Sequence, residues 1–194
     1  MTLACNLLVL DIDETLLHAD DGPVRGADFR VFDYGITKRP GLDAFLRWCF
    51  ASRDVFRTAV WTAGGADYAT ALFDVLLEPG EQFEFVWASD RCSRVLRRPD
   101  DDGWDDGDRY TVVKDLKKLH KKYDLNRVLH VDNTPSVACR NYGNLVQIPS
   151  FYATPRLAGD EDDRYLELLQ PKLFEWFAAP SVRAIDKRGW WRRG

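Results

Sequence analysis

The 194-residue sequence lacks several features that would assign it to a specialised class of protein. Its four cysteines form no C-x-x-C pair, which argues against a zinc ribbon and a dithiol redox motif. No apolar run approaches the roughly 18 residues that span a bilayer, and no basic segment precedes the first apolar run. We therefore expect a soluble, cytoplasmic protein with reduced thiols, or a nuclear one if its source is eukaryotic.

An excess of charge of one sign is also missing. The chain has 27 basic and 31 acidic side chains, a net charge of −4, which argues against a surface that coats nucleic acid. No internal repeat and no linker rich in Pro, Gly or Ser divides the sequence. Hydrophobic residues make up 45% of the chain, enough for one domain with a substantial core. We place this domain at residues 1–180, followed by a basic tail with two tryptophans at 181–194.

Short apolar runs alternate with longer amphipathic stretches along the domain. The runs predict five buried strands, at residues 7–10, 58–61, 85–87, 128–131 and 145–148. The amphipathic stretches predict four helices: one starting at Pro40, one at 68–77, one carrying Leu116, Leu119 and Tyr123, and one at 165–177. This order predicts the α/β class, with three layers and a mostly parallel central sheet covered on both faces.

Two segments depart from the alternation. Residues 97–109 contain six aspartates around two glycines and a tryptophan, and we expect an acidic loop. The tail at 181–194 combines Trp190 and Trp191 with five basic residues. It is either a frayed or back-packed terminus, or a contact surface for a partner, a nucleic acid or an anionic membrane.

Polar residues follow three of the predicted strands. Asp11 and Asp13 follow the first strand, Thr62 the second and Asp132 the fourth, while Lys114 adds a cation. In a parallel sheet these strand ends meet at one edge, where ligands bind. Carboxylates about 4 Å apart repel by roughly 4 kcal/mol per pair at an effective dielectric near 20, so their convergence requires a cation. A hard divalent ion with oxygen ligands, most commonly Mg²⁺, fits this requirement.

Five segments in this order resemble the phosphatases of the RNA polymerase II C-terminal domain, a family within the haloacid dehalogenase superfamily. The segments are LDIDETLLH at 10–18, KRPG at 38–41, WTA at 61–63, VKDL at 113–116 and VDNTP at 131–135. The resemblance extends over roughly residues 5 to 178. It implies a Rossmann-like fold of the haloacid dehalogenase type with a small β-flap.

The resemblance also implies roles for individual residues. Asp11 attacks phosphorus and carries an aspartyl-phosphate, while Asp13 protonates the leaving oxygen and then deprotonates water. The Thr62 hydroxyl and the Ala63 backbone N–H bind phosphate oxygens, and Lys114 offsets the phosphoryl charge.

A magnesium site is implied by the same resemblance. The family holds its metal through the first aspartate carboxylate, the carbonyl of the second aspartate and an acid or amide of the fourth motif. In this sequence those positions are Asp11, Asp13 and the pair Asp132 and Asn133.

Several residues near these motifs have simpler interpretations. Thr15 is a candidate turn or cap residue, Asp115 a candidate helix N-cap, and His130 a candidate strand residue. Cys92 and Arg98 fit the C-x5-R pattern of cysteine phosphatases, but the segment lacks the glycines that let backbone amides surround an anion. We therefore assign the chemistry to the aspartates.

The substrate class follows from the absence of room for a cap domain. Residues 18–38 suffice only for a β-flap, so the site is expected to be open and to bind a large partner. An open site favours a phosphoprotein or a nucleic-acid end, and of these the family resemblance implies a protein serine/threonine phosphatase. We expect a preference for basic flanks, because the acidic segment 97–109 repels phosphate-rich chains. The alternatives are a polynucleotide 3′-phosphatase or other phosphomonoesterase, and a non-catalytic phosphoprotein-binding module.

Overall fold

The computed structural model describes residues 5–21, 26–96, 110–153 and 163–192. A five-stranded sheet with the order β10-β9-β1-β5-β6 lies at its centre, and every neighbouring pair is parallel. Its strands are β1 (Asn6–Leu10), β5 (Phe56–Trp61), β6 (Val86–Trp87), β9 (Val128–Asp132) and β10 (Leu145–Gln147). All five predicted strands are confirmed, with ends that differ by no more than two residues.

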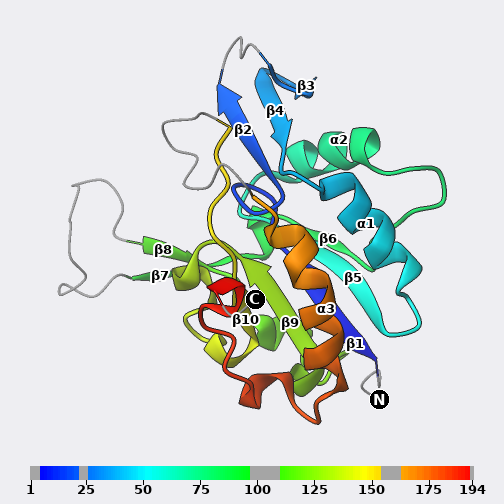
Figure 1. Ribbon diagram of the computed structural model, residues 1–194. Coiled ribbons are helices and arrows are strands. Elements are labelled where there is room, and N and C mark those ends of the chain that lie inside the picture. Colours follow the sequence, from blue (N-terminus) through cyan, green and yellow to red (C-terminus); the bar gives the residue numbers. More distant parts are fainter. Residues whose placement is uncertain (1–4, 22–25, 97–109, 154–162, 193–194) are drawn as a thin grey trace.

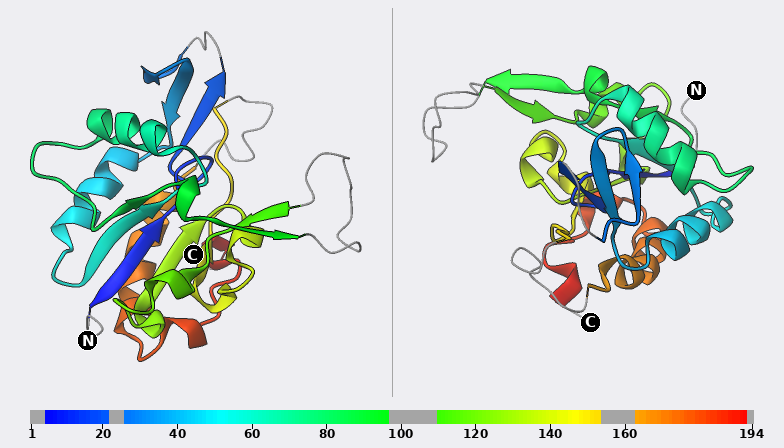
Figure 2. Two further views of the ribbon diagram at one scale, coloured as in Figure 1. Left: turned by 180° about the vertical axis from the view of Figure 1, so that it is seen from behind. Right: turned by 90° about the horizontal axis from the view of Figure 1, so that it is seen from above.

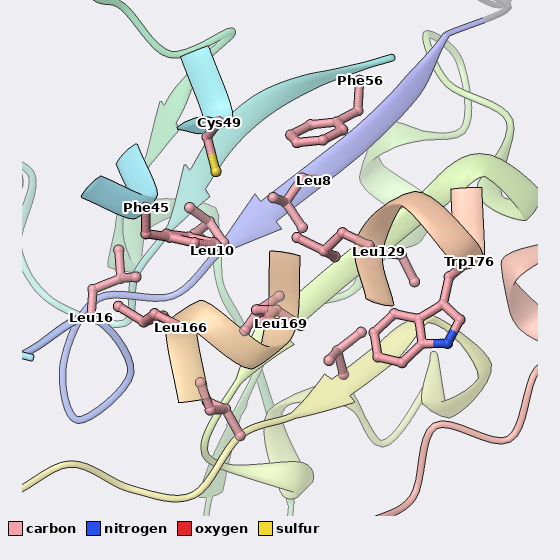
Figure 3. Close-up of a cluster of buried hydrophobic side chains, with 14 of the residues drawn as sticks. Leu8, Leu10, Leu16, Phe45, Cys49, Phe56, Leu129, Leu166, Leu169 and Trp176 are labelled. Atoms are coloured by element: carbon pink, nitrogen blue, oxygen red, sulfur yellow. The ribbon is translucent and has the colours of Figure 1, made fainter. Parts of the chain in front are cut away.

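Three α-helices cover one face of this sheet (Figures 1 and 2). They are α1 (Leu42–Ala51), α2 (Ala66–Leu76) and α3 (Tyr165–Ala178). Leu8 and Leu10 point to this face and pack against α1 and α3, as Figure 3 shows. The first helix was expected to start at Pro40, but Gly41 intervenes as the N-cap with a φ of 80°. The sharp change of direction at this glycine sets the start of the helix two residues later.

The opposite face carries short 3-10 helices in place of the predicted third α-helix. Leu7 and Val9 point to this face, where they contact Leu116 and Leu119. The helices here are η2 (Leu116–Leu119) and η3 (Leu125–Arg127). The α-helix prediction was wrong because a separate 3-10 helix begins after Asp124. Asp124 is the N-cap of η3, and its carboxylate accepts a hydrogen bond from the Asn126 N–H. The remaining 3-10 helices are η1 (Ser89–Arg91), η4 (Pro135–Ala138), η5 (Tyr142–Asn144), η6 (Val182–Ala184) and η7 (Trp190–Arg192).

Two smaller β-structures project from the body (Figure 1). The predicted β-flap is an antiparallel sheet of order β2-β4-β3, made of β2 (Leu17–Asp21), β3 (Phe29–Val31) and β4 (Tyr34–Lys38). The second is an antiparallel hairpin of β7 (Ser93–Leu96) and β8 (Tyr110–Val113), which the strand prediction missed. The acidic segment 97–109 lies outside the described residues.

The described part of the tail packs back onto the domain. Trp190 is buried among the core side chains, and its indole N–H donates to the Gln147 carbonyl at 2.7 Å. Lys187 is also buried and donates to three backbone carbonyls, those of Gly143, Val182 and Ile185. Of the two expectations for the tail, back-packing therefore holds for the described residues. None of the helices in these ranges is long and apolar enough to cross a membrane.

Candidate active site

A tight turn after β1 presents the first two aspartates at the carboxyl edge of the sheet. The Asp11 N–H donates to the Val131 carbonyl at 3.0 Å, and the Leu16 N–H closes the turn on the Ile12 carbonyl at 2.8 Å. Glu14 takes a left-handed φ of 54° within this turn. The chain therefore turns directly from β1 into β2, the first strand of the flap. Asp11 and Asp13 both lie in this turn, at the carboxyl edge of the sheet.

Thr15 connects this turn to the loop after β9. Its hydroxyl lies 2.9 Å from Asp11 Oδ2 and accepts from the Asn133 N–H at 3.1 Å. The predicted supporting role of Thr15 is consistent with these contacts, because one hydroxyl joins two loops that are 118 residues apart.

Lys114 lies between two buried carboxylates. Its ammonium donates to Asp11 Oδ1 and, at 2.7 Å, to Asp132 Oδ2. The other oxygen of Asp132 accepts from the Thr134 N–H at 2.9 Å. Each of the three charged residues is at most 6% exposed. The structure thus brings Lys114 together with Asp11 and Asp132, which the sequence placed after two separate strands.

Burial and charge act against each other in this cluster. Burial raises the pKa of Asp11, and the nearby Asp132 adds to the rise while Lys114 opposes it. Burial alone would lower the pKa of Lys114, but the two carboxylates together raise it. The pKa of Asp132 is lowered because Lys114 and His130 outweigh its burial. One ammonium therefore faces two carboxylates. When both carboxylates are ionised, the cluster carries a net negative charge that a further cation would neutralise.

Asp13 is held from the segment that follows β5. The Thr62 hydroxyl lies 3.4 Å from Asp13 Oδ2, and the Tyr68 hydroxyl donates to Asp13 Oδ1 at 3.0 Å. Thr62 also accepts from the Gly64 N–H at 2.9 Å, while Ala63 next to it is exposed. Sequence reasoning missed Tyr68, because a tyrosine early in an amphipathic helix carries no signal that its hydroxyl reaches a carboxylate 55 residues away.

Arg39 is a second residue whose role the sequence did not show. It belongs to the KRPG segment, is 1% exposed, and donates to the Thr15 and Pro149 carbonyls at 2.8 Å. Its Nε also pairs with the Asp163 carboxylate at 2.9 Å. Arg39 thereby connects the loop after β1, through Thr15, to Pro149 and Asp163. These two residues lie in the described segments before and after residues 154–162.

Asn133 presents a side-chain oxygen beside Asp11 in the loop after β9. Its Oδ1 lies 3.2 Å from the Thr15 hydroxyl, beside Asp11, and its Nδ2 donates to Ser150 at 3.0 Å. Within the described ranges no three His, Cys, Asp or Glu side chains gather closely enough to hold a metal ion. A set of one carboxylate, one amide and one backbone carbonyl is all oxygen, however, and suits Mg²⁺.

The remaining candidates have structural surroundings. Asp115 accepts from the Lys117 N–H as the N-cap of η2 and pairs with Arg140 at 2.8 Å. His130 is fully buried on β9, and its pKa is lowered by burial. Burial also raises the pKa of Cys92, the opposite of what a thiolate nucleophile requires, and its proposed partner Arg98 lies outside the described residues.

Comparisons with known proteins identify the family of this chain. The family model "NLI interacting factor-like phosphatase" matches residues 6–183. A Dictyostelium discoideum protein, "Probable C-terminal domain small phosphatase", is 31% identical over 186 residues, which cover 92% of this chain and 53% of that protein. The human "Carboxy-terminal domain RNA polymerase II polypeptide A small phosphatase 1" is 31% identical over 153 residues, covering 75% of this chain and 51% of its own. The chain spans about half the length of these two relatives.

A solved structure shares the fold. Fcp1, described as an essential RNA polymerase II CTD phosphatase, aligns over 90% of this chain and 62% of its own, with a TM-score of 0.63 and 18% identity. At this identity the likeness shows the fold alone, and the fold is of the predicted α/β class with a parallel central sheet. Since the family model extends from the first strand of the sheet into the tail, the chain belongs to the NLI interacting factor-like phosphatase family.

Proposed function

We propose that this protein is a phosphatase that hydrolyses phosphomonoesters through an aspartyl-phosphate on Asp11. The observation that carries the proposal is the placement of Asp11 and Asp13 in one turn, with Lys114 against Asp11. A nucleophile, a proton donor and a cation for the phosphoryl charge then lie at one sheet edge. Membership of a family described as phosphatases supports the same activity.

The side chains divide the reaction between them. Asp11 attacks phosphorus through its carboxylate, while Asp13 gives its proton to the leaving oxygen and later removes one from the attacking water. The Thr62 hydroxyl and the Ala63 N–H hold phosphate oxygens, and Lys114 stabilises the negative charge on the phosphoryl group. Asp132 holds Lys114, since Asp132 Oδ2 accepts from the ammonium at 2.7 Å.

Mg²⁺ is the proposed cofactor. The Asp11 carboxylate, the Asp13 carbonyl and the Asn133 side-chain oxygen would hold it. Asp132 remains a candidate ligand; its two oxygens accept hydrogen bonds from Lys114 and the Thr134 N–H, as those of Asp11 accept from Lys114 and Thr15. When bound, the ion would offset the excess of carboxylate charge around the phosphate.

The proposed substrate is phosphoserine or phosphothreonine within a protein chain. The described residues between Asp13 and α1 form the turn and the three short flap strands, which leave the sheet edge open to a large partner. The Dictyostelium discoideum and human relatives are named as small phosphatases of a C-terminal domain. A preference for basic flanks rests on the acidic composition of residues 97–109.

Phosphate release from a mixed panel tests the proposal. The panel contains phosphoserine, phosphothreonine and phosphotyrosine peptides, 3′-phosphorylated oligonucleotides and p-nitrophenyl phosphate, each with Mg²⁺ or EDTA. We expect Mg²⁺-dependent release that is greatest for phosphoserine or phosphothreonine and is abolished by Asp11→Asn. Release that survives Asp11→Asn but is lost in Cys92→Ser would contradict the aspartyl mechanism. Absence of release from every substrate would indicate a binding module.

A further inference from the structure

Both oxygens of the Asp13 carboxylate face hydroxyl groups from the segment after β5. Oδ1 accepts from the Tyr68 hydroxyl at 3.0 Å, and Oδ2 lies 3.4 Å from the Thr62 hydroxyl. The first distance is typical of a well-formed hydrogen bond, whereas the second is long. Tyr68 is therefore the stronger of the two contacts on this carboxylate.

The ring of Tyr68 is fixed in place by its surroundings. Tyr68 is the third residue of α2, and Tyr34 of the flap meets it edge-on with ring centroids 5.8 Å apart. The backbone at Gly64 also approaches the ring so closely that a Cβ there would lie 3.3 Å from Tyr68 Cδ1. The hydroxyl is the donor in its contact with Asp13, as expected of a tyrosine, whose ordinary pKa of about 10 keeps it protonated at neutral pH.

Thr62 is not free to hold Asp13 during the reaction. Its hydroxyl already accepts from the Gly64 N–H at 2.9 Å, and it has a single proton to donate. In the proposed function that proton goes to a phosphate oxygen. Once phosphate is bound, Tyr68 is left as the hydroxyl that fixes the Asp13 side chain.

We propose that Tyr68 is a positioning residue for the general acid: its hydrogen bond to Oδ1 orients the Asp13 carboxyl group and keeps the transferable proton on Oδ2. This inference rests on the proposed function. In the first step, the bond from Asp11 to phosphorus forms and the bond from phosphorus to the leaving oxygen breaks. The proton on Asp13 Oδ2 passes to that oxygen, Asp13 becomes a carboxylate, and Tyr68 retains its own proton.

The leaving group provides the test. An alkoxide such as that of serine needs a proton as it departs, whereas p-nitrophenolate leaves without one. We therefore compare kcat/KM for a phosphoserine peptide and for p-nitrophenyl phosphate, since this constant covers the steps through transfer of phosphate to Asp11. Tyr68→Phe removes the hydroxyl and keeps the ring. Tyr34→Phe, at the adjoining ring, is the matched control.

We expect Tyr68→Phe to lower kcat/KM for the phosphoserine peptide by about tenfold or more, while that for p-nitrophenyl phosphate changes by less than about threefold. Tyr34→Phe should leave the ratio of the two constants unchanged. An equal loss on both substrates would assign Tyr68 a merely structural role and overturn the inference, as would the absence of a loss on either substrate.

Failure of this inference and failure of the proposed function give different results. If the positioning role is wrong, the wild-type protein still hydrolyses both substrates and Asp11→Asn still abolishes hydrolysis of both. If the wild-type protein hydrolyses neither, or Asp11→Asn remains active, the aspartyl mechanism itself is wrong and the positioning role falls with it. A thermal melt of Tyr68→Phe close to that of the wild type would show that both measurements concern a folded protein.

Discussion

Replacing Lys114 by methionine removes the cation between two buried carboxylates while keeping an unbranched side chain of similar length. In the wild-type protein the ammonium donates to Asp11 and Asp132, and all three residues are almost inaccessible to solvent. Without it, two buried negative charges face each other, and among the described side chains that contact them only His130, whose pKa is lowered by burial, can take up a positive charge. The substitution should therefore destabilise the fold as well as abolish activity.

The magnitude follows from two independent considerations. Removing one partner of a buried ion pair costs about 3–5 kcal/mol, because the other charge stays buried and uncompensated. Two unit charges roughly 5 Å apart repel by about 3 kcal/mol at an effective dielectric near 20. We therefore expect Lys114→Met to lower the free energy of unfolding at pH 8 by about 3–5 kcal/mol. For a chain of this size that corresponds to a fall in Tm of roughly 10 °C.

The loss should depend on pH in a defined direction. Burial already raises the pKa of Asp11 in the folded protein, and without Lys114 only the hydrogen bond from the Thr15 hydroxyl opposes that rise. The folded state then holds a proton that the unfolded chain releases near its ordinary pKa of about 4. Stability therefore falls as the pH rises through the interval between the two values. At pH 5 the variant should recover much of its stability relative to the wild type.

Urea unfolding in EDTA at pH 5 and pH 8 measures both effects. Lys117→Met is the matched control, because Lys117 is exposed and lies three residues away. The reasoning would be refuted if Lys114→Met lost less than about 1 kcal/mol at pH 8. It would also be refuted if the loss were the same at both pH values.

Three further substitutions test other contacts. Arg39→Met should lower the free energy of unfolding by about 3 kcal/mol, measured by urea unfolding, because it leaves the Asp163 carboxylate without its partner; a loss no larger than that of the exposed Arg47→Met would contradict this role. Trp190→Ala should cost about 3–5 kcal/mol in the same assay, since the indole lies in the core; a loss below 1 kcal/mol would show that the tail is not part of the fold. Gly64→Val should lower kcat/KM for p-nitrophenyl phosphate by about tenfold through its contacts with Thr62 and Tyr68, whereas Gly65→Val, whose Cβ meets nothing within 4 Å, should not.

The central strands β1 and β9 were the most predictable because they are buried on both faces. A central parallel strand such as β1 shows an unbroken apolar run, and all five of its residues are buried. The end of the run at Asp11 also marks the carboxyl edge. The candidate site could therefore be placed at that edge from residue order alone.

Less could be predicted where a segment is covered on one side only. The spacing of Leu116 and Leu119 fits both an α-helix and a 3-10 helix, so periodicity did not distinguish them. The hairpin of β7 and β8 was missed because its exposed residues interrupt any apolar run. In these segments the capping side chains and the pairing partner decide the structure.

The sequence by itself determined the order of the strands along the chain, the α/β class and the identities of the residues at the strand ends. Burial imposes a local pattern that is visible in any short window of residues. The tertiary structure alone decided that all three α-helices share one face, that Lys114 joins Asp11 to Asp132, and that Tyr68 reaches Asp13. These contacts connect residues up to 103 positions apart, and they arise only when parallel pairing sets the strands in register.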